Sequence, residues 1–163
     1  MDARVDKTLE ITTPSDLEIA MTRLFDAPRH LVFDAMTQPA HVRHWLGCAE
    51  MPMTICEIDL RVGGVYRFTL RSPDGRETTL QGTYREVVRP ERVVFVERIL
   101  MPGFTSDEYQ VTSSFAEIAG RTRLTTTILH QSKENRDSHL NSGIERGVAP
   151  AYDRIAEIIA AMG

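Results

Sequence analysis

Residues 144–162 read IERGVAPAYDRIAEIIAAM, and this stretch decides the fold class of the 163-residue chain. Its apolar residues recur at intervals of three and four, which predicts an amphipathic helix with one buried face. That face consists of Ile144, Val148, Ala151, Tyr152, Ile155, Ile159 and Met162. A long helix with a single apolar face must pack against a second layer, so the rest of the chain has to supply that layer.

Gly147 and Pro150 fall inside this predicted helix. A glycine costs about 1 kcal/mol relative to alanine within a helix, and a proline removes one helical hydrogen bond. Two interpretations remain open: a long helix bent at Pro150, or a helix that starts near Pro150 with Gly147 in a preceding loop. We favour one long helix over 136–162, because Ile144 and Val148 keep the phase of the apolar face.

The second layer is predicted to be a sheet, because residues 53–131 show strand patterns throughout. Short turns separate the strands, for example at residues 72–75 (SPDG) and at Ala119-Gly120. The predicted strands cover 53–60, 65–70, 78–88, 93–99, 108–118 and 122–131. Consecutive strands joined by short turns predict an antiparallel meander. Residues 100–107 are expected to form a loop, and whether this loop gates a cavity is left open.

Residues 17–47 predict one strand followed by two short helices. Alternating apolar residues predict a strand over 17–25. Asp26 is expected to cap the first helix, with Pro28 in its first turn. Gln38-Pro39 should end this helix, and Gly47 should end a second helix over 40–46. A short strand over 8–12 and a flexible segment over 1–7 are expected to precede them.

Composition limits the class of protein. The hydrophobic content of 42% and the length fit one domain over residues 1–163. The net charge of −4 argues against nucleic acid as a partner. No apolar run approaches the roughly 18 residues of a membrane span, so no membrane span is expected. The polar N-terminus does not resemble a signal peptide, and the two cysteines do not form a disulfide framework; we expect a cytoplasmic protein.

The predicted order of elements and five local motifs resemble one known superfamily. The motifs are FDAPR with VFDAMT (25–37), PAHVRHWLG (39–47), DLRVGGVYRF (59–68), GTYREVVRPERVVF (82–95) and SGIERG with YDRIAE (142–157). Together they resemble the START-like (SRPBCC) superfamily, in the branch of the activator of the heat-shock-protein-90 ATPase. The resemblance covers about residues 8–162. The usual Trp-Trp-Gly-Pro of this branch is Trp45-Leu46-Gly47-Cys48 here.

This resemblance implies an α+β helix-grip (START/Bet v 1-like) fold. In such a fold a curved antiparallel sheet wraps on a long C-terminal helix, and two short helices follow the first strand. It also implies an apolar cavity between the sheet and that helix. The predicted cavity lining is Phe33, Met36, Trp45, Tyr66, Phe68, Tyr84, Arg98, Tyr109, His130, Val148 and Tyr152. For each residue the alternative is an ordinary place in the hydrophobic core.

Three classes of function remain open. The leading hypothesis is a non-catalytic domain that binds a small hydrophobic or aromatic molecule, without a cofactor. The second is an enzyme of the polyketide cyclase or aromatase type, in which Arg98, His130 or a cavity tyrosine acts as the acid and Glu97 is a further candidate. The third is an interaction domain that resembles the chaperone activator. Exposed sheet edges also leave a homodimer open.

A metal site is the weakest candidate. His41, His44 and Cys48 follow helical spacing, and Cys56 could be a fourth ligand for zinc. Gly47 is expected to end the helix before Cys48, which would take this thiol off the helical face. We therefore expect an exposed helix face, two inert thiols and no metal.

Overall fold

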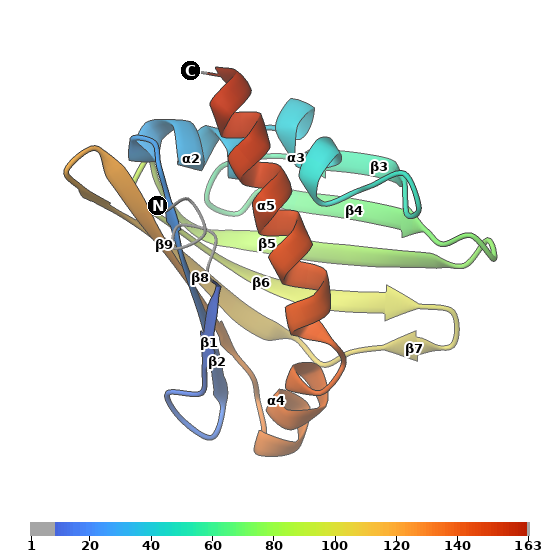
Figure 1. Cartoon of the computed structure of the whole chain (residues 1–163). Helices are drawn as coiled ribbons and strands as arrows, with labels where there is room; N and C mark the ends of the chain where they lie inside the picture. Colours follow the sequence, from blue (N-terminus) through green and yellow to red (C-terminus); the bar gives the residue numbers. More distant parts are fainter. Residues whose placement is uncertain (1–8, 163) are drawn as a thin grey trace.

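The computed structural model describes residues 9–162, and in this part of the chain nine strands form a single antiparallel sheet (Figure 1). The strands lie in the order β1-β2-β9-β8-β6-β5-β4-β3, and the short β7 pairs with β6. Their bounds are β1 Glu10–Thr12, β2 Glu18–Phe25, β3 Met53–Ile58, β4 Val65–Arg71, β5 Glu77–Val88, β6 Arg92–Met101, β7 Phe104–Thr105, β8 Tyr109–Ile118 and β9 Arg121–Leu129.

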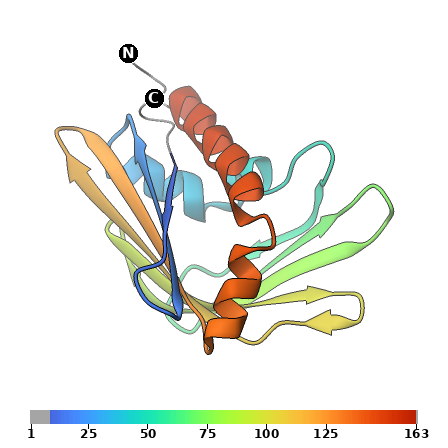
Figure 2. The ribbon, with the colours of Figure 1, turned by 60° about the horizontal axis from the view of Figure 1, so that its bottom comes forward.

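The helices lie on the concave side of this sheet. The helix bounds are α2 Arg29–Thr37, α3 Pro39–Trp45, α4 Lys133–Leu140 and α5 Ile144–Met162. The sheet curves around α5, while α2 and α3 contact α5 at one end of the molecule (Figures 1 and 2). This arrangement confirms the predicted α+β helix-grip fold.

The core beneath α5 joins the helices to the sheet. Phe33 on α2 and Ile155 on α5 are completely buried, as is Leu124 on β9. The rings of Phe33 and Phe115 meet edge to face, with centroids 5.3 Å apart. No helix among residues 9–162 is long and apolar enough to span a membrane.

The start of α2 differs from the prediction. Asp26 was expected to cap this helix, but the N-cap position is Pro28, which makes no side-chain capping bond. Asp26 therefore lies two residues before the cap, whereas a capping side chain bonds the amides of the first turn from the cap position itself. Its carboxylate instead pairs with Arg121 at 3.6 Å.

The C-terminal segment is divided into two helices. α4 ends at Leu140, and Gly143 has a positive φ of 89°, a conformation that few other residues adopt readily. α5 then begins at Ile144 and continues through Pro150. The predicted single helix over 136–162 therefore corresponds to part of α4, a short break and all of α5.

The segment predicted as a loop over 100–107 is part of a β-hairpin. β6 continues to Met101, and β7 pairs back onto it, with Met101 opposite Phe104. Pro102 and Gly103 form the turn between them, where Gly103 has a φ of 76°. The sequence did not reveal this hairpin, because a two-residue strand is too short to show an alternating pattern.

Candidate functional site

The main candidate site is a cavity between the concave face of the sheet and the helices α3 and α5. We call it the main cavity. Its volume is about 410 Å³, which falls in the range of roughly 300–1,000 Å³ that is typical of small-molecule pockets. Seven of the residues predicted from the sequence line it: Met36, Trp45, Tyr66, Phe68, Tyr84, Val148 and Tyr152.

The other four predicted residues lie elsewhere. Phe33 is 0% exposed and belongs to the core. Arg98 is exposed, and its guanidinium lies 4.0 Å from the Glu108 carboxylate. Tyr109 and His130 line a second pocket. The main cavity therefore gathers five of the seven aromatic residues of the predicted set and neither of its basic residues, Arg98 and His130.

Glu97 is a cavity residue that the predicted lining omitted. It lines the main cavity together with Phe95, on the same face of β6. Side chains alternate between the two faces of a strand, so an inward Glu97 places Arg98 on the outer face. The apolar residues at 93 and 95 were the available signal, because they share the face of residue 97.

Two tyrosine hydroxyls hold the Glu97 carboxylate. Tyr66 donates a hydrogen bond of 2.5 Å to Oε1, and Tyr109 donates a hydrogen bond to Oε2. Burial raises the pKa of Glu97, whereas the hydrogen bonds from Tyr109 and Tyr66 oppose that rise. Burial and the nearby Glu97 charge raise the pKa of both tyrosines, so both remain protonated donors at neutral pH.

Gly82 makes the contact between Tyr66 and Glu97 possible. Gly82 on β5 pairs with Tyr66 on one side and with Glu97 on the other. A Cβ atom at position 82 would lie 2.5 Å from the Tyr66 hydroxyl oxygen and 2.6 Å from its ring carbon Cε2. The missing side chain therefore leaves the space in which the Tyr66 ring crosses β5 to reach the carboxylate.

The Tyr66 ring is also the centre of an aromatic cluster. Its centroid lies 5.0 Å from that of Phe68, 5.4 Å from that of Tyr84 and 5.3 Å from that of Phe95. All four rings line the main cavity. Glu97 therefore lies beside a continuous aromatic wall.

Trp45 supplies the opposite, helical side of the cavity and is fixed in place. Its Nε1 donates a hydrogen bond of 2.8 Å to the Ala35 carbonyl oxygen. Its own carbonyl accepts a bond of 2.9 Å from Nε of Arg154 on α5. Leu46, which stands at the second tryptophan of the motif, also lines the cavity.

The second pocket has a volume of about 550 Å³ and lies between the β6–β7 hairpin and α4. His130 Nε2 and His139 Nδ1 are 2.9 Å apart there. The Tyr109 ring packs on both imidazoles, with centroid distances of 5.1 and 5.5 Å. Because its hydroxyl bonds Glu97, Tyr109 links this pocket to the main cavity.

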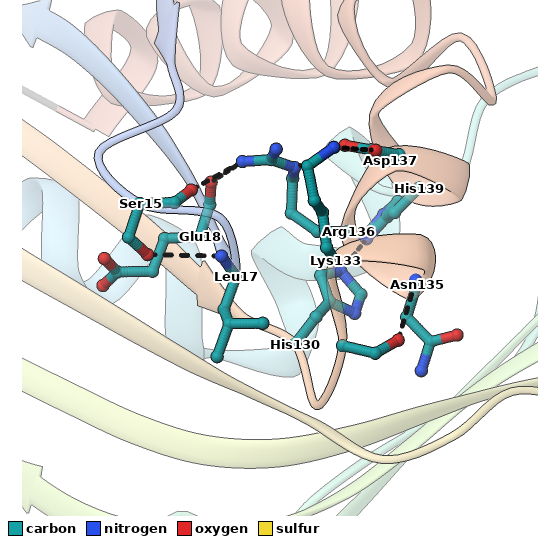
Figure 3. Close-up of polar contacts among 10 residues, drawn as sticks. Ser15, Leu17, Glu18, His130, Lys133, Asn135, Arg136, Asp137 and His139 are labelled. Carbon is teal, nitrogen blue, oxygen red and sulfur yellow. Dashed lines mark hydrogen bonds and ion pairs between the residues drawn. The ribbon is translucent and has the colours of Figure 1, made fainter.

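Buried Arg136 anchors α4, the helix that carries His139 (Figure 3). Its Nη1 donates hydrogen bonds to the carbonyl oxygens of Ser15, at 2.6 Å, and Glu18, at 3.2 Å. Its Nε bonds Asp137 at 2.8 Å. α4 is thus attached to the segment that leads into β2.

The histidine pair predicts a pH-dependent stability. Burial, together with the charge of His130, lowers the pKa of His139 to about 4. The unfolded imidazole has a pKa near 6.5, so between these values the unfolded chain binds the extra proton. Stability from this group is therefore complete above pH ~6.5 and is lost as the pH falls toward about 4, by up to about 3 kcal/mol.

This prediction can be measured by urea unfolding of the wild type and His139→Asn between pH 7 and 4. Carboxyl groups titrate in both proteins, so they cancel in the difference between the two unfolding free energies. The advantage of the wild type should shrink as the pH falls. Two curves that stay parallel would show that His139 does not titrate in this way.

The residues weighed as zinc ligands are spread over the surface near α3. His44 is exposed, while the Cys56 thiol lies 3.8 Å from the Pro39 carbonyl oxygen. Cys48 lies beyond α3, which ends at Trp45. Within the described part of the chain, no group of three or more His, Cys, Asp or Glu residues is placed to hold a metal ion.

One family model matches most of the chain. A family model described as "Activator of Hsp90 ATPase homolog 1-like protein" matches residues 26–160. No curated protein matches the sequence. Among solved structures, a Rhodobacter sphaeroides protein is 26% identical, with a TM-score of 0.87, over 94% of this chain and 99% of that chain.

Two further solved structures show the same fold at lower identity. A Mycobacterium smegmatis protein is 23% identical, with a TM-score of 0.84, over 96% of this chain and 100% of that chain. A Nitrosomonas europaea protein is 18% identical, with a TM-score of 0.80, over 92% of this chain and 98% of that chain. These two likenesses support the fold and do not bear on the ligand.

Proposed function

The chain belongs to the activator of Hsp90 ATPase homolog 1-like family, and from this premise we propose that it is a non-catalytic cytoplasmic domain that binds a small hydrophobic or aromatic molecule in the main cavity. The observation that carries the proposal is the cavity itself, which is lined by aromatic and aliphatic side chains. A largely apolar pocket with a few convergent polar groups is the usual form of a small-molecule site.

The polar groups of the cavity favour one orientation of a bound ligand. Glu97 with its two tyrosine donors gives one fixed polar point, and the fixed Trp45 gives one rigid wall. Preorganised groups reduce the entropy that a ligand must lose on binding.

Native mass spectrometry of the purified protein, before and after denaturation, tests the proposal directly. Loss of a small mass on denaturation is the expected result.

A substitution that fills the cavity provides a second test. Ala151 on α5 is buried and lines the cavity, so Ala151→Trp should place an indole in the ligand space. Binding of hydrophobic compounds, measured by calorimetry, should weaken by more than about tenfold, because overpacking excludes the ligand. Ala160→Trp, on the exposed side of the same helix, is the matched control and should bind normally. Equal affinities for both variants would contradict the assignment of the site.

The interaction role is a second candidate, and the description of the family favours it. That role predicts stimulation of a chaperone ATPase by the purified domain. The enzyme alternative loses two of its predicted acids, because Arg98 and His130 are not among the residues that line the main cavity, and keeps Glu97 and the cavity tyrosines. A domain that stimulates the ATPase and carries no ligand would favour the interaction role.

A further inference from the structure

We propose that the preferred ligand of the main cavity is an apolar molecule with one protonated amine, held by Glu97 and the aromatic wall beside it. The inference rests on the proposed binding function and names the chemical class of its ligand.

Charge is the first argument. Among the described residues that line the main cavity, Glu97 is the only aspartate, glutamate, lysine, arginine or histidine. A ligand carboxylate would meet this like charge in a pocket of low polarity, which is unfavourable. A ligand ammonium would meet an opposite charge, and it would itself favour the ionised form of Glu97 that burial alone disfavours. The cavity therefore disfavours anionic ligands and favours a ligand with a single positive charge.

Hydrogen-bonding capacity is the second argument. Each oxygen of a carboxylate has two lone pairs, and each Glu97 oxygen accepts one tyrosine hydroxyl. Both tyrosine protons are used in these bonds. The capacity left on Glu97 and these two tyrosines is acceptor capacity, so a ligand must bring donors to use it. An ammonium group carries donors and no acceptor.

The aromatic wall is the third argument. Tyr66 joins Glu97 directly and lies 5.0 to 5.4 Å from the rings of Phe68, Tyr84 and Phe95. The faces of such rings attract cations within about 6 Å. A carboxylate beside clustered aromatic rings is therefore a suitable setting for an organic ammonium group.

Four of the other hydroxyls of the cavity are engaged with the protein, whereas the Tyr84 hydroxyl makes no hydrogen bond to another described residue. The Thr126 hydroxyl lies 3.3 Å from the Tyr152 hydroxyl and 3.4 Å from the Ser113 hydroxyl. The Thr37 hydroxyl donates a bond of 2.7 Å to the Phe33 carbonyl oxygen. The rest of the lining is apolar and would enclose a hydrocarbon or aromatic body.

Calorimetry with three probes of similar size tests the inference: 4-phenylbutylamine, 4-phenylbutan-2-one and 4-phenylbutanoate, all at pH 7. The wild type should bind the amine about tenfold more tightly than the ketone, and the carboxylate most weakly. Glu97→Gln keeps the shape of the side chain and removes its charge, so the preference for the amine should disappear. Glu57→Gln, which removes an exposed carboxylate on β3, should keep it.

The outcomes separate this inference from the proposed function. Tighter binding of the ketone would mean that Glu97 acts as a neutral donor, which overturns the amine and leaves a hydrophobic-ligand site. Tightest binding of the carboxylate would overturn the inference in the same way. Failure of all three probes to bind the wild type would reject both. The comparison within the wild type needs no variant, so it decides the question even if Glu97→Gln does not fold.

Discussion

Replacing Phe33 with alanine is expected to lower the free energy of unfolding by about 3–5 kcal/mol. Phe33 is completely buried on α2, and its ring packs edge to face on Phe115 of β8. Truncation would remove the apolar contact between the helix and the sheet and leave a cavity that close-packed neighbours cannot fill. Urea unfolding monitored by circular dichroism measures the loss.

Phe104→Ala is the matched control for this prediction. Phe104 is 54% exposed on β7, so its truncation should change the unfolding free energy by no more than about 0.5 kcal/mol. The comparison also separates the two interpretations of Phe33, which are a residue that lines the cavity, as predicted from the sequence, and a residue of the hydrophobic core. A loss of less than about 1.5 kcal/mol in Phe33→Ala would argue against its place in the core.

Gly82→Ala is expected to destabilise the protein by about 1–3 kcal/mol, toward the upper end of the range for overpacking. The added methyl group would collide with the Tyr66 ring and with the Val96 carbonyl oxygen. A backbone atom of the neighbouring strand cannot move away as a flexible side chain can. The displaced ring should also lose its hydrogen bond to Glu97, so binding of 4-phenylbutylamine should weaken.

The matched control has the opposite expected sign. Gly147 lies in α5, and a Cβ atom added there meets no atom within 4 Å. Gly147→Ala should therefore leave the stability unchanged or raise it by up to about 1 kcal/mol, because alanine favours the helix. Urea unfolding of both variants measures the contrast. Equal effects would mean that position 82 carries no special steric constraint.

Periodicity explains why most of the fold could be predicted. The helix over 144–162 and the strands between 53 and 131 each bury one side against a neighbouring layer. One-sided burial makes apolar residues recur with the period of the helix or strand, so the local sequence shows the element. The turn at Ala119-Gly120 was visible for a similar reason. Gly120 has a positive φ of 78°, which glycine adopts without strain, and Ala119 before it has a φ of 53°.

Features that depend on a partner elsewhere in the chain could not be predicted. Asp26 carries the composition of a helix cap, but its pairing with Arg121 depends on how β9 lies beside the start of α2. The separate α4 depends on Arg136, which reaches the carbonyl oxygens of Ser15 and Glu18 more than a hundred residues away. Local patterns contain no record of such contacts.

The residues of the candidate site also divide into those that local patterns predict and those that depend on distant contacts. The aromatic lining could be predicted because large apolar residues on one strand face point toward the interior. Glu97 was named as a candidate acid but left out of the predicted lining, because charged side chains are seldom buried. Its two tyrosine donors come from β4 and β8, which are separate parts of the sequence. Arg98, its neighbour, was chosen instead, although the alternation of β6 places it on the outer face.

The bond between Tyr66 and Glu97 also limits which substitutions this chain can accept. Three positions on three strands share one space: the ring at 66, the empty place at 82 and the carboxylate at 97. A larger residue at 82 would fill the space through which the Tyr66 ring reaches Glu97. A smaller residue at 66 would leave the Glu97 carboxylate without one of its two hydrogen-bond donors. These three positions should therefore change together, and not one at a time, among descendants of this chain.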